Sequence, residues 1–322
     1  MLDTSANGVF VIAVTPFTER GGIDTASVDR MVDFYRGCGV AGITVLGMMG
    51  EAPKLTHEES IRLTQQVVQR SKLPVVVGVS APGFASMAQL TKAVMDVGAA
   101  GVMIAPASTL KTDDQIAAYY ANAAEAVGRD VPFVIQDYPY STGVVLAPSV
   151  IRRIVEENPS CVMLKHEDWP GLDKITAVRR FIAAGSMRHI SILCGNGGLF
   201  LPQELVRGAD GAMTGYAFPE MLVELVRLIK AGNQAQGHDL FDLHLPLLRY
   251  EQQPGIGLAV RKYVLKRRGV ILSDAQRRPG GQLSTESVAE VEWMLSRLAA
   301  KTGANVLGPC SSVGAAAQTP LP

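Results

Sequence analysis

The chain has 322 residues, no formal net charge at pH 7, 48% hydrophobic residues and 19% charged residues. This composition is typical of a globular protein with a large core and excludes a disordered chain. It offers no basic stripe for nucleic acid and no basic amphipathic segment for a membrane surface. The first residues carry no secretory signal, and no apolar run reaches the ~20 residues of a membrane span, so we expect a cytoplasmic protein.

Strand-like apolar runs recur along the chain, and each is followed by a segment of helical period. The eight runs cover residues 9–16, 42–47, 74–80, 101–106, 132–139, 161–167, 191–196 and 211–216. They are continuously apolar rather than alternating, which indicates parallel strands buried on both faces. Such units form a doubly wound sheet or a closed barrel, and eight of them favour an α/β fold of the (β/α)8 TIM-barrel type.

The expected barrel occupies residues 1–232. Residues 233–268 and 285–298 have helical periodicity, and we interpret the segment 233–300 as a C-terminal helical layer of the same domain. Residues 301–322 are rich in Gly, Ala, Ser and Pro, which predicts a flexible tail.

The sixth run contains the clearest catalytic candidate, Lys165. Active sites of these barrels lie at the C-terminal ends of the strands, where a desolvated lysine favours the neutral amine that can attack a ketone. Strand alternation places Met163, Lys165 and Glu167 on one face and His166 on the other. The alternative is that Lys165 reaches solvent or simply pairs with Glu167.

Other polar residues lie at the ends of the fifth, second and seventh runs. Gln136 and Tyr138 share a face and could meet Lys165, although a polar strand end that enters a turn would look the same. The turn 47–51 offers backbone N–H groups that could hold a carboxylate. The seventh run ends in the glycine-rich turn 195–198, where many barrels bind phosphate, although tight geometry alone also explains such glycines.

We expect neither a metal site nor a cofactor. The five histidines have no metal-ligand spacing and the four cysteines have no CxxC spacing. Buried free thiols are therefore expected rather than disulfides or a zinc site.

Several ordered motifs resemble the dihydrodipicolinate synthase and N-acetylneuraminate lyase family. The similar segments are 14–17, 47–51, 139–143, Lys165 and 211–215. The resemblance implies a class I lyase in which Lys165 forms an imine with pyruvate or another 2-keto acid, in a homotetramer or homodimer. Together with the strand ends it indicates a substrate site made of Met48, Met49, Gly50, Glu51, Thr142, Gly195, Asn196, Thr214 and Tyr216.

Four departures from the family pattern concern the substrate. Met48 and Met49 stand where the family has a hydroxylated pair, Gln136 where it has a proton-transferring tyrosine, and Ser141 where the synthases have an arginine. The tyrosine that usually follows the proline of the fourth strand is also missing, since Ala107 comes after Pro106. The segments 135–139, 165–167 and 211–219 instead resemble the branch that dehydrates 2-keto-3-deoxy sugar acids.

The sequence therefore predicts a Schiff-base lyase of a small 2-keto acid, a dehydratase or aldolase of a 2-keto-3-deoxy sugar acid, with low synthase activity. Gln136, Tyr138 and Glu167 are the catalytic candidates beside Lys165. Glu167 is the first candidate for acid–base work, with a purely structural pairing to Lys165 as the alternative. Two further alternatives are a synthase-type condensation of pyruvate with an aldehyde and a non-catalytic barrel that only binds keto acids.

Overall fold

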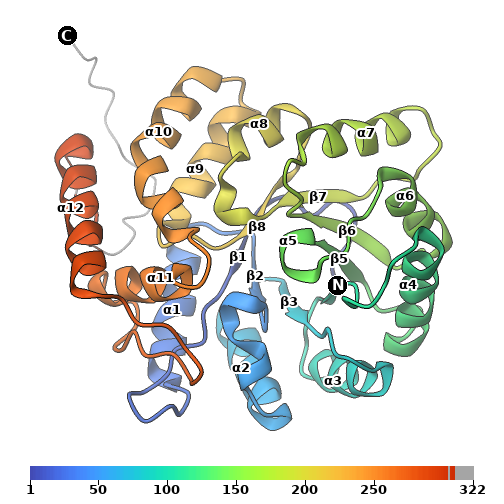
Figure 1. Ribbon diagram of the computed structural model, residues 1–322, viewed down its shortest axis with the longest axis horizontal. Coiled ribbons are helices and arrows are strands. Elements are labelled where there is room, and N and C mark those ends of the chain that lie inside the picture. Colours follow the sequence, from blue (N-terminus) through green and yellow to red (C-terminus); the bar gives the residue numbers. More distant parts are fainter. Residues whose placement is uncertain (304, 309–322) are drawn as a thin grey trace.

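Eight parallel strands form a closed barrel at the centre of the computed structural model, which describes residues 1–303 and 305–308 (Figure 1). The strands follow the chain order around the barrel, and β8 pairs with β1. They are β1 (Gly8–Ile12), β2 (Gly42–Val45), β3 (Val75–Gly78), β4 (Gly101–Ile104), β5 (Phe133–Asp137), β6 (Cys161–His166), β7 (Ser191–Cys194) and β8 (Gly211–Thr214). The predicted (β/α)8 fold is confirmed.

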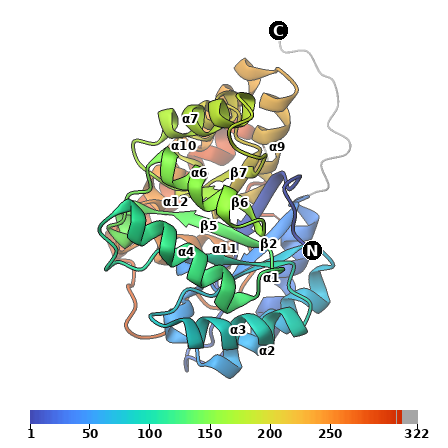
Figure 2. The same ribbon diagram turned by 90° about the vertical axis from the view of Figure 1, so that its right-hand side faces the viewer.

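Helices surround the barrel on its outside (Figures 1 and 2). Those of the barrel are α1 (Thr25–Gly37), α2 (His57–Ser71), α3 (Phe84–Asp96), α4 (Asp113–Val127), α5 (Pro139–Thr142), α6 (Pro148–Glu157), α7 (Leu172–Ala183), α8 (Leu201–Val206) and α9 (Pro219–Lys230). Their start points follow local chemistry. At α2, the Thr56 side chain accepts from the Glu59 backbone N–H while the Glu59 carboxylate accepts from the Thr56 N–H, a complete capping box.

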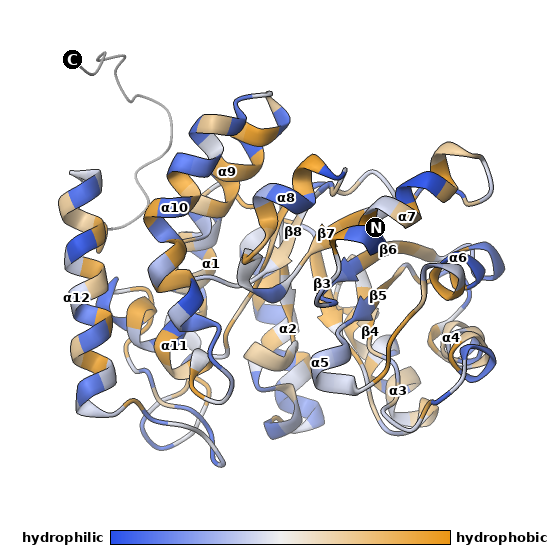
Figure 3. Cartoon of the chain, turned by 45° about the horizontal axis from the view of Figure 1, so that its top comes forward, coloured by the Kyte–Doolittle hydropathy of each residue, from blue (hydrophilic) through white to orange (hydrophobic). Residues whose placement is uncertain are grey.

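Two apolar layers form the core. One fills the barrel interior and includes Phe10, Val76, Met103 and Met163, while a larger one lies between strands and helices. In Figure 3 the strands are mostly hydrophobic, whereas the surrounding helices carry both hydrophobic and polar residues. Since alternate side chains of each strand enter alternate layers, a residue two positions from Met163 faces the barrel interior.

The first of the C-terminal helices packs beside α9, and the two that follow pack against that helix (Figure 1). The predicted helical stretch 233–268 is in fact two helices, α10 (Gln234–Glu251) and α11 (Gly257–Arg267). The break follows from Pro254 and from Gly255, whose φ of 85° lies in the left-handed region. The last helix, α12 (Thr285–Thr302), runs past its expected end at residue 298.

Several other expectations can be compared with the described residues. Cys161 and Cys194 are buried free thiols as expected, whereas Cys38 is not a free thiol and Cys310 lies outside the described part of the chain. Most of the expected tail, residues 304 and 309–322, also lies outside it. Within residues 1–303 and 305–308, no helix has the length and apolar character needed to cross a membrane.

Candidate active site

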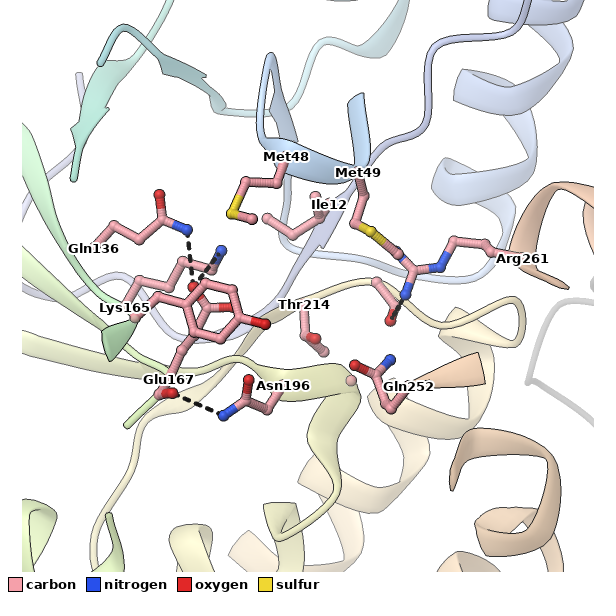
Figure 4. A pocket seen from close by; sticks show the side chains of 13 residues that line it. Ile12, Met48, Met49, Gln136, Lys165, Glu167, Asn196, Thr214, Gln252 and Arg261 are labelled. Atoms are coloured by element: carbon pink, nitrogen blue, oxygen red, sulfur yellow. Dashed lines mark hydrogen bonds and ion pairs between the residues drawn. The ribbon is translucent and has the colours of Figure 1, made fainter. Parts of the chain in front are cut away.

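A pocket opens at the C-terminal ends of the strands and holds Lys165 (Figure 4). Its lining consists of Ile12, Met48, Met49, Gln136, Tyr138, Lys165, Glu167, Asn196, Gly197, Thr214, Gly215, Gln252 and Arg261. The pocket thus brings together residues from the ends of six strands and from the C-terminal helices. Eight of the side chains that the sequence singled out are among them.

Lys165 and Glu167 lie on the barrel side of β6, as strand alternation predicted. The Lys165 Nζ is 2.9 Å from the Glu167 Oε2, and the two residues are only 4% and 8% exposed. His166 points to the opposite side, where its Nδ1 lies 3.7 Å from the Asp137 carboxylate. A buried amine next to a carboxylate can exchange a proton with it directly.

Gln136 adds a third group to this pair. It is the register partner of Lys165 on the neighbouring strand β5, and its Nε2 donates to the Glu167 Oε2 at 2.9 Å. The same carboxylate oxygen therefore receives an amide hydrogen bond and an ion pair. This arrangement fixes the orientation of Glu167 toward the amine, as the dashed lines of Figure 4 show.

Tyr138 follows β5 and contributes its phenol to the pocket wall. Burial, and secondarily the nearby Glu167 carboxylate, raises the pKa of Tyr138 to about 12. The phenol is therefore protonated at neutral pH and can donate a hydrogen bond or a proton, but it is a poor base there.

The turn after β7 contacts Glu167 and helps to hold it in place. The Asn196 Nδ2 donates to the Glu167 backbone oxygen at 2.9 Å, and Asn196 has a left-handed φ of 49°. Gly195 leaves room for Glu167, since a Cβ at that position would lie 2.1 Å from the Glu167 Cγ. Gly195, predicted to bind substrate, is not among the lining residues, and its missing side chain makes space for the carboxylate.

The turn after β2 forms the opposite wall with Met48, which is 51% exposed, and Met49. The Thr15 hydroxyl donates to the Gly50 carbonyl at 2.6 Å and so attaches this turn to the end of β1. Within the turn, the Gly50 and Glu51 N–H groups are used internally. This leaves the amides of Met48 and Met49 as the candidates for a substrate carboxylate.

Four more predicted substrate residues lie outside the pocket lining, each for a structural reason. Gly50 and Glu51 face away, and the Glu51 carboxylate binds the Lys262 Nζ at 2.6 Å. The Thr142 hydroxyl donates to the Tyr138 carbonyl within α5 at 3.1 Å. Tyr216 is fully buried, with its hydroxyl 3.1 Å from the His244 Nδ1.

Five lining residues were not anticipated from the sequence: Ile12, Gly197, Gly215, Gln252 and Arg261. Gln252 ends α10, and Arg261 lies on α11. Arg261 is 2% exposed, but α11 carries three further basic residues, so no local pattern singled it out. In residues 1–303 and 305–308 no group of three or more His, Cys, Asp or Glu side chains could hold a metal ion.

A closed parallel barrel with a buried lysine and carboxylate at its C-terminal mouth defines the class I, Schiff-base-forming lyases. The model of the dihydrodipicolinate synthetase family matches residues 5–298, and the chain belongs to this family of enzymes. The family assignment made from the motifs is thereby confirmed.

Individual relatives carry two kinds of name. The crystal structure of dihydrodipicolinate synthase from Rhodopseudomonas palustris is 57% identical, covers 92% of this chain and 99% of its own, and has a TM-score of 0.91. The 4-hydroxy-tetrahydrodipicolinate synthase of Methanothrix thermoacetophila is 30% identical over 245 residues, 75% of this chain and 80% of that protein. The L-2-keto-3-deoxyarabonate dehydratase of Azospirillum brasilense is 28% identical over 297 residues, 90% of this chain and 94% of that protein.

Proposed function

We propose that the protein joins pyruvate, or another small 2-keto acid, to an aldehyde through an imine on Lys165, and cleaves the corresponding aldol in reverse. The observation that carries the proposal is the buried Lys165 amine, 2.9 Å from the Glu167 carboxylate. The 57% identity to a protein named dihydrodipicolinate synthase supports condensation. The sequence motifs alone favoured dehydration, so this comparison changes the order of the two candidates.

The reaction begins when Glu167 takes a proton from the Lys165 ammonium, and the neutral amine attacks the keto carbon. Glu167 returns this proton to the hydroxyl of the adduct, which leaves as water. The protonated imine that results withdraws electrons from the neighbouring C3–H bond. Glu167 removes the C3 proton, and the electron pair forms an enamine. The enamine carbon then attacks the aldehyde carbon, the aldehyde oxygen takes up a proton, and water hydrolyses the imine to release the product and free Lys165.

Glu167 and Tyr138 divide the proton transfers in this scheme. Glu167 is the base because its carboxylate is directed toward the amine by Gln136. Tyr138, whose pKa of about 12 keeps it protonated, is suited to donate to the aldehyde oxygen as negative charge develops there. Gln136 cannot titrate and acts as the group that positions Glu167.

Dehydration of a 2-keto-3-deoxy sugar acid is the second candidate. It uses the same imine and enamine, but the enamine expels the C4 hydroxyl as water instead of attacking an aldehyde. The dehydratase of Azospirillum brasilense supports it because the match covers 94% of that protein. The Gln136–Glu167 hydrogen bond supports it too, since these residues belong to the motifs that resemble the dehydratase branch.

Borohydride trapping with pyruvate tests the imine. Borohydride reduces the imine to a stable amine, so mass spectrometry should find the added mass on the peptide that contains Lys165. Lys165→Met should abolish the adduct. Lys54→Met, which removes another lysine near the mouth of the site, should retain it. An adduct on a different lysine, or none with any 2-keto acid, would overturn the proposal.

Product analysis separates the candidate reactions. Pyruvate with a panel of aldehydes should give aldol products, at higher catalytic efficiency than the conversion of 2-keto-3-deoxy sugar acids to dehydrated products. The opposite ratio would establish dehydration as the main activity. An imine without turnover of either substrate set would establish the non-catalytic alternative.

A further inference from the structure

The far side of the pocket contains a buried cation that the imine chemistry does not use. Arg261, from α11, is 2% exposed and lines the same pocket as Lys165. Its Nε donates to Glu251 and its Nη2 to the Gly215 carbonyl, each at 2.5 Å. Its Nη1 has no hydrogen-bond partner among the described residues. The guanidinium is thus held by two fixed contacts at the wall of the pocket, and its buried Nη1 is left without a partner (Figure 4).

A second unpartnered donor lies in the same region. Gln252, at the C-terminal end of α10, lines the pocket, and its Nε2 has no partner among the described residues. The amide packs closely on the turn after β7, since a Cβ on Gly197 would lie 2.2 Å from this Nε2. Two nitrogen donors from neighbouring helices therefore face the side of the pocket away from Lys165, as Figure 4 shows.

Buried hydrogen-bond donors without partners are energetically unfavourable, and they are retained where a ligand accepts their hydrogen bonds. A planar guanidinium with free N–H groups fits a carboxylate particularly well, because both oxygens can accept and the hydrogen bonds are charge-assisted. Beside its ion pair with Glu251, Arg261 thus keeps an unpartnered Nη1, whereas the single ammonium of Lys54 near the mouth lies 2.8 Å from Glu51. Ser141, in the position where the synthases have an arginine, lines a neighbouring pocket that shares Met48 and Tyr138 with the first, and it carries no charge.

We propose that Arg261 and Gln252 bind a second carboxylate, carried by the substrate at the end remote from the imine. This inference rests on the proposed function and names its substrate class: a 2-keto acid with a terminal carboxylate. The cation that selects the second group would then come from α11 of the C-terminal layer instead of from α5.

The test uses imine trapping, which requires no knowledge of the second substrate. Pyruvate reports the imine itself. 2-Oxoglutarate and 2-oxoadipate carry a terminal carboxylate, and 2-oxopentanoate and 2-oxohexanoate are their uncharged counterparts of equal chain length. For at least one length, the concentration that gives half-maximal trapping should be roughly 10–100-fold lower for the dicarboxylate.

Two variants assign this preference to the proposed groups. Arg261→Lys keeps the charge near Glu251 but loses the forked donors, and Gln252→Met keeps the side-chain length but loses the N–H. Each should reduce the preference for the dicarboxylate by roughly 10-fold. Arg267→Lys is the matched control, because this arginine also lies on α11 but pairs with Glu292 on the exposed side, and it should leave the preference unchanged.

The outcomes separate the two proposals. If pyruvate itself gives no adduct on Lys165, the proposed function fails. If pyruvate is trapped but neither dicarboxylate is preferred over its counterpart, the carboxylate site is wrong. The site is also wrong if the preference survives in both variants, or if 5-hydroxy-2-oxopentanoate is trapped as readily as 2-oxoglutarate, since the ligand would then be an uncharged oxygen.

Discussion

Glu167 is the residue whose role most affects the mechanism. Glu167→Gln removes the proposed base and keeps the size of the side chain, so turnover should fall by about 10²–10⁴-fold. Imine formation with pyruvate should persist, because the Lys165 amine remains. Steady-state kinetics and borohydride trapping on the same preparation measure the two effects separately.

The neighbouring acid provides the control for this substitution. Asp168 pairs with Lys174 outside the pocket lining, so Asp168→Asn should leave turnover close to that of the natural protein. Near-normal turnover of Glu167→Gln would limit Glu167 to an ion-pair role. Tyr138→Phe would then be the next variant to measure.

Gly195 gives a second prediction at the scale of single residues. An alanine Cβ would lie 2.1 Å from the Glu167 Cγ and 2.5 Å from its Oε1, so Gly195→Ala should displace the carboxylate and lower turnover at least 10-fold. Gly37→Ala, where a Cβ meets nothing within 4 Å, should have little effect. Equal activity of the two variants would show that the carboxylate does not need this position.

Residues whose orientation depends only on their own strand could be predicted from the sequence. Alternation along β6 was enough to separate Lys165 and Glu167 from His166, because the period of a strand is independent of the rest of the fold. It could not find Arg261 or Gln252, which reach the pocket from helices that lie far along the chain. Their contribution depends on how the C-terminal layer packs, which no local pattern encodes.

At the scale of elements, α10 carries a buried histidine that makes the fold sensitive to acid. His244 lies against Tyr216 and Phe218, and burial lowers its pKa to about 4 from 6.5. Between these two pKa values the imidazole is protonated in the unfolded chain but neutral in the folded chain. The free energy of unfolding therefore has its full value above pH 6.5 and decreases as the pH falls toward 4, by roughly 3 kcal/mol from this group.

His244→Asn should flatten this dependence, because asparagine does not titrate and its oxygen can still accept from Tyr216. The measurement is the free energy of unfolding by urea between pH 4 and pH 8 for both proteins. The variant is expected to be less stable at pH 8 but to lose less stability on acidification. Parallel curves would mean that His244 is not the group responsible.

The turn between α10 and α11 was not predicted from the sequence, although it determines which residues of these helices reach the pocket. Helical periodicity on both sides of residues 252–256 suggested one continuous helix, although Pro254 and Gly255 are strong stop signals. The break places Gln252 at a helix end and starts α11 in the direction that brings Arg261 to the pocket. By contrast, every strand was located correctly, since continuous apolar runs of strand length are unambiguous when they repeat.

At the scale of the whole molecule, one buried ion pair joins the C-terminal layer to the barrel. The Lys262 Nζ on α11 lies 2.6 Å from the Glu51 Oε1, and both side chains are almost completely buried. Glu51 has a left-handed φ of 56° and follows the turn that carries Met48 and Met49. The pair therefore couples the packing of α11 to the shape of the pocket wall.

Lys262→Met should destabilise the protein by about 3 kcal/mol, at the low end of the cost of leaving a buried charge without its partner. The low end is expected because Glu51 keeps its ion pair with Lys54 at 2.8 Å and its hydrogen bond from the Arg277 N–H at 3.1 Å. Lys266 lies on the same helix and forms a partly exposed ion pair with Asp274, so Lys266→Met should cost less than ~1 kcal/mol. Urea unfolding of the two variants gives both values. If Lys262→Met costs no more than Lys266→Met, methionine packing replaces the ion pair fully, and the link between the C-terminal layer and the pocket wall would have to come from apolar contacts instead.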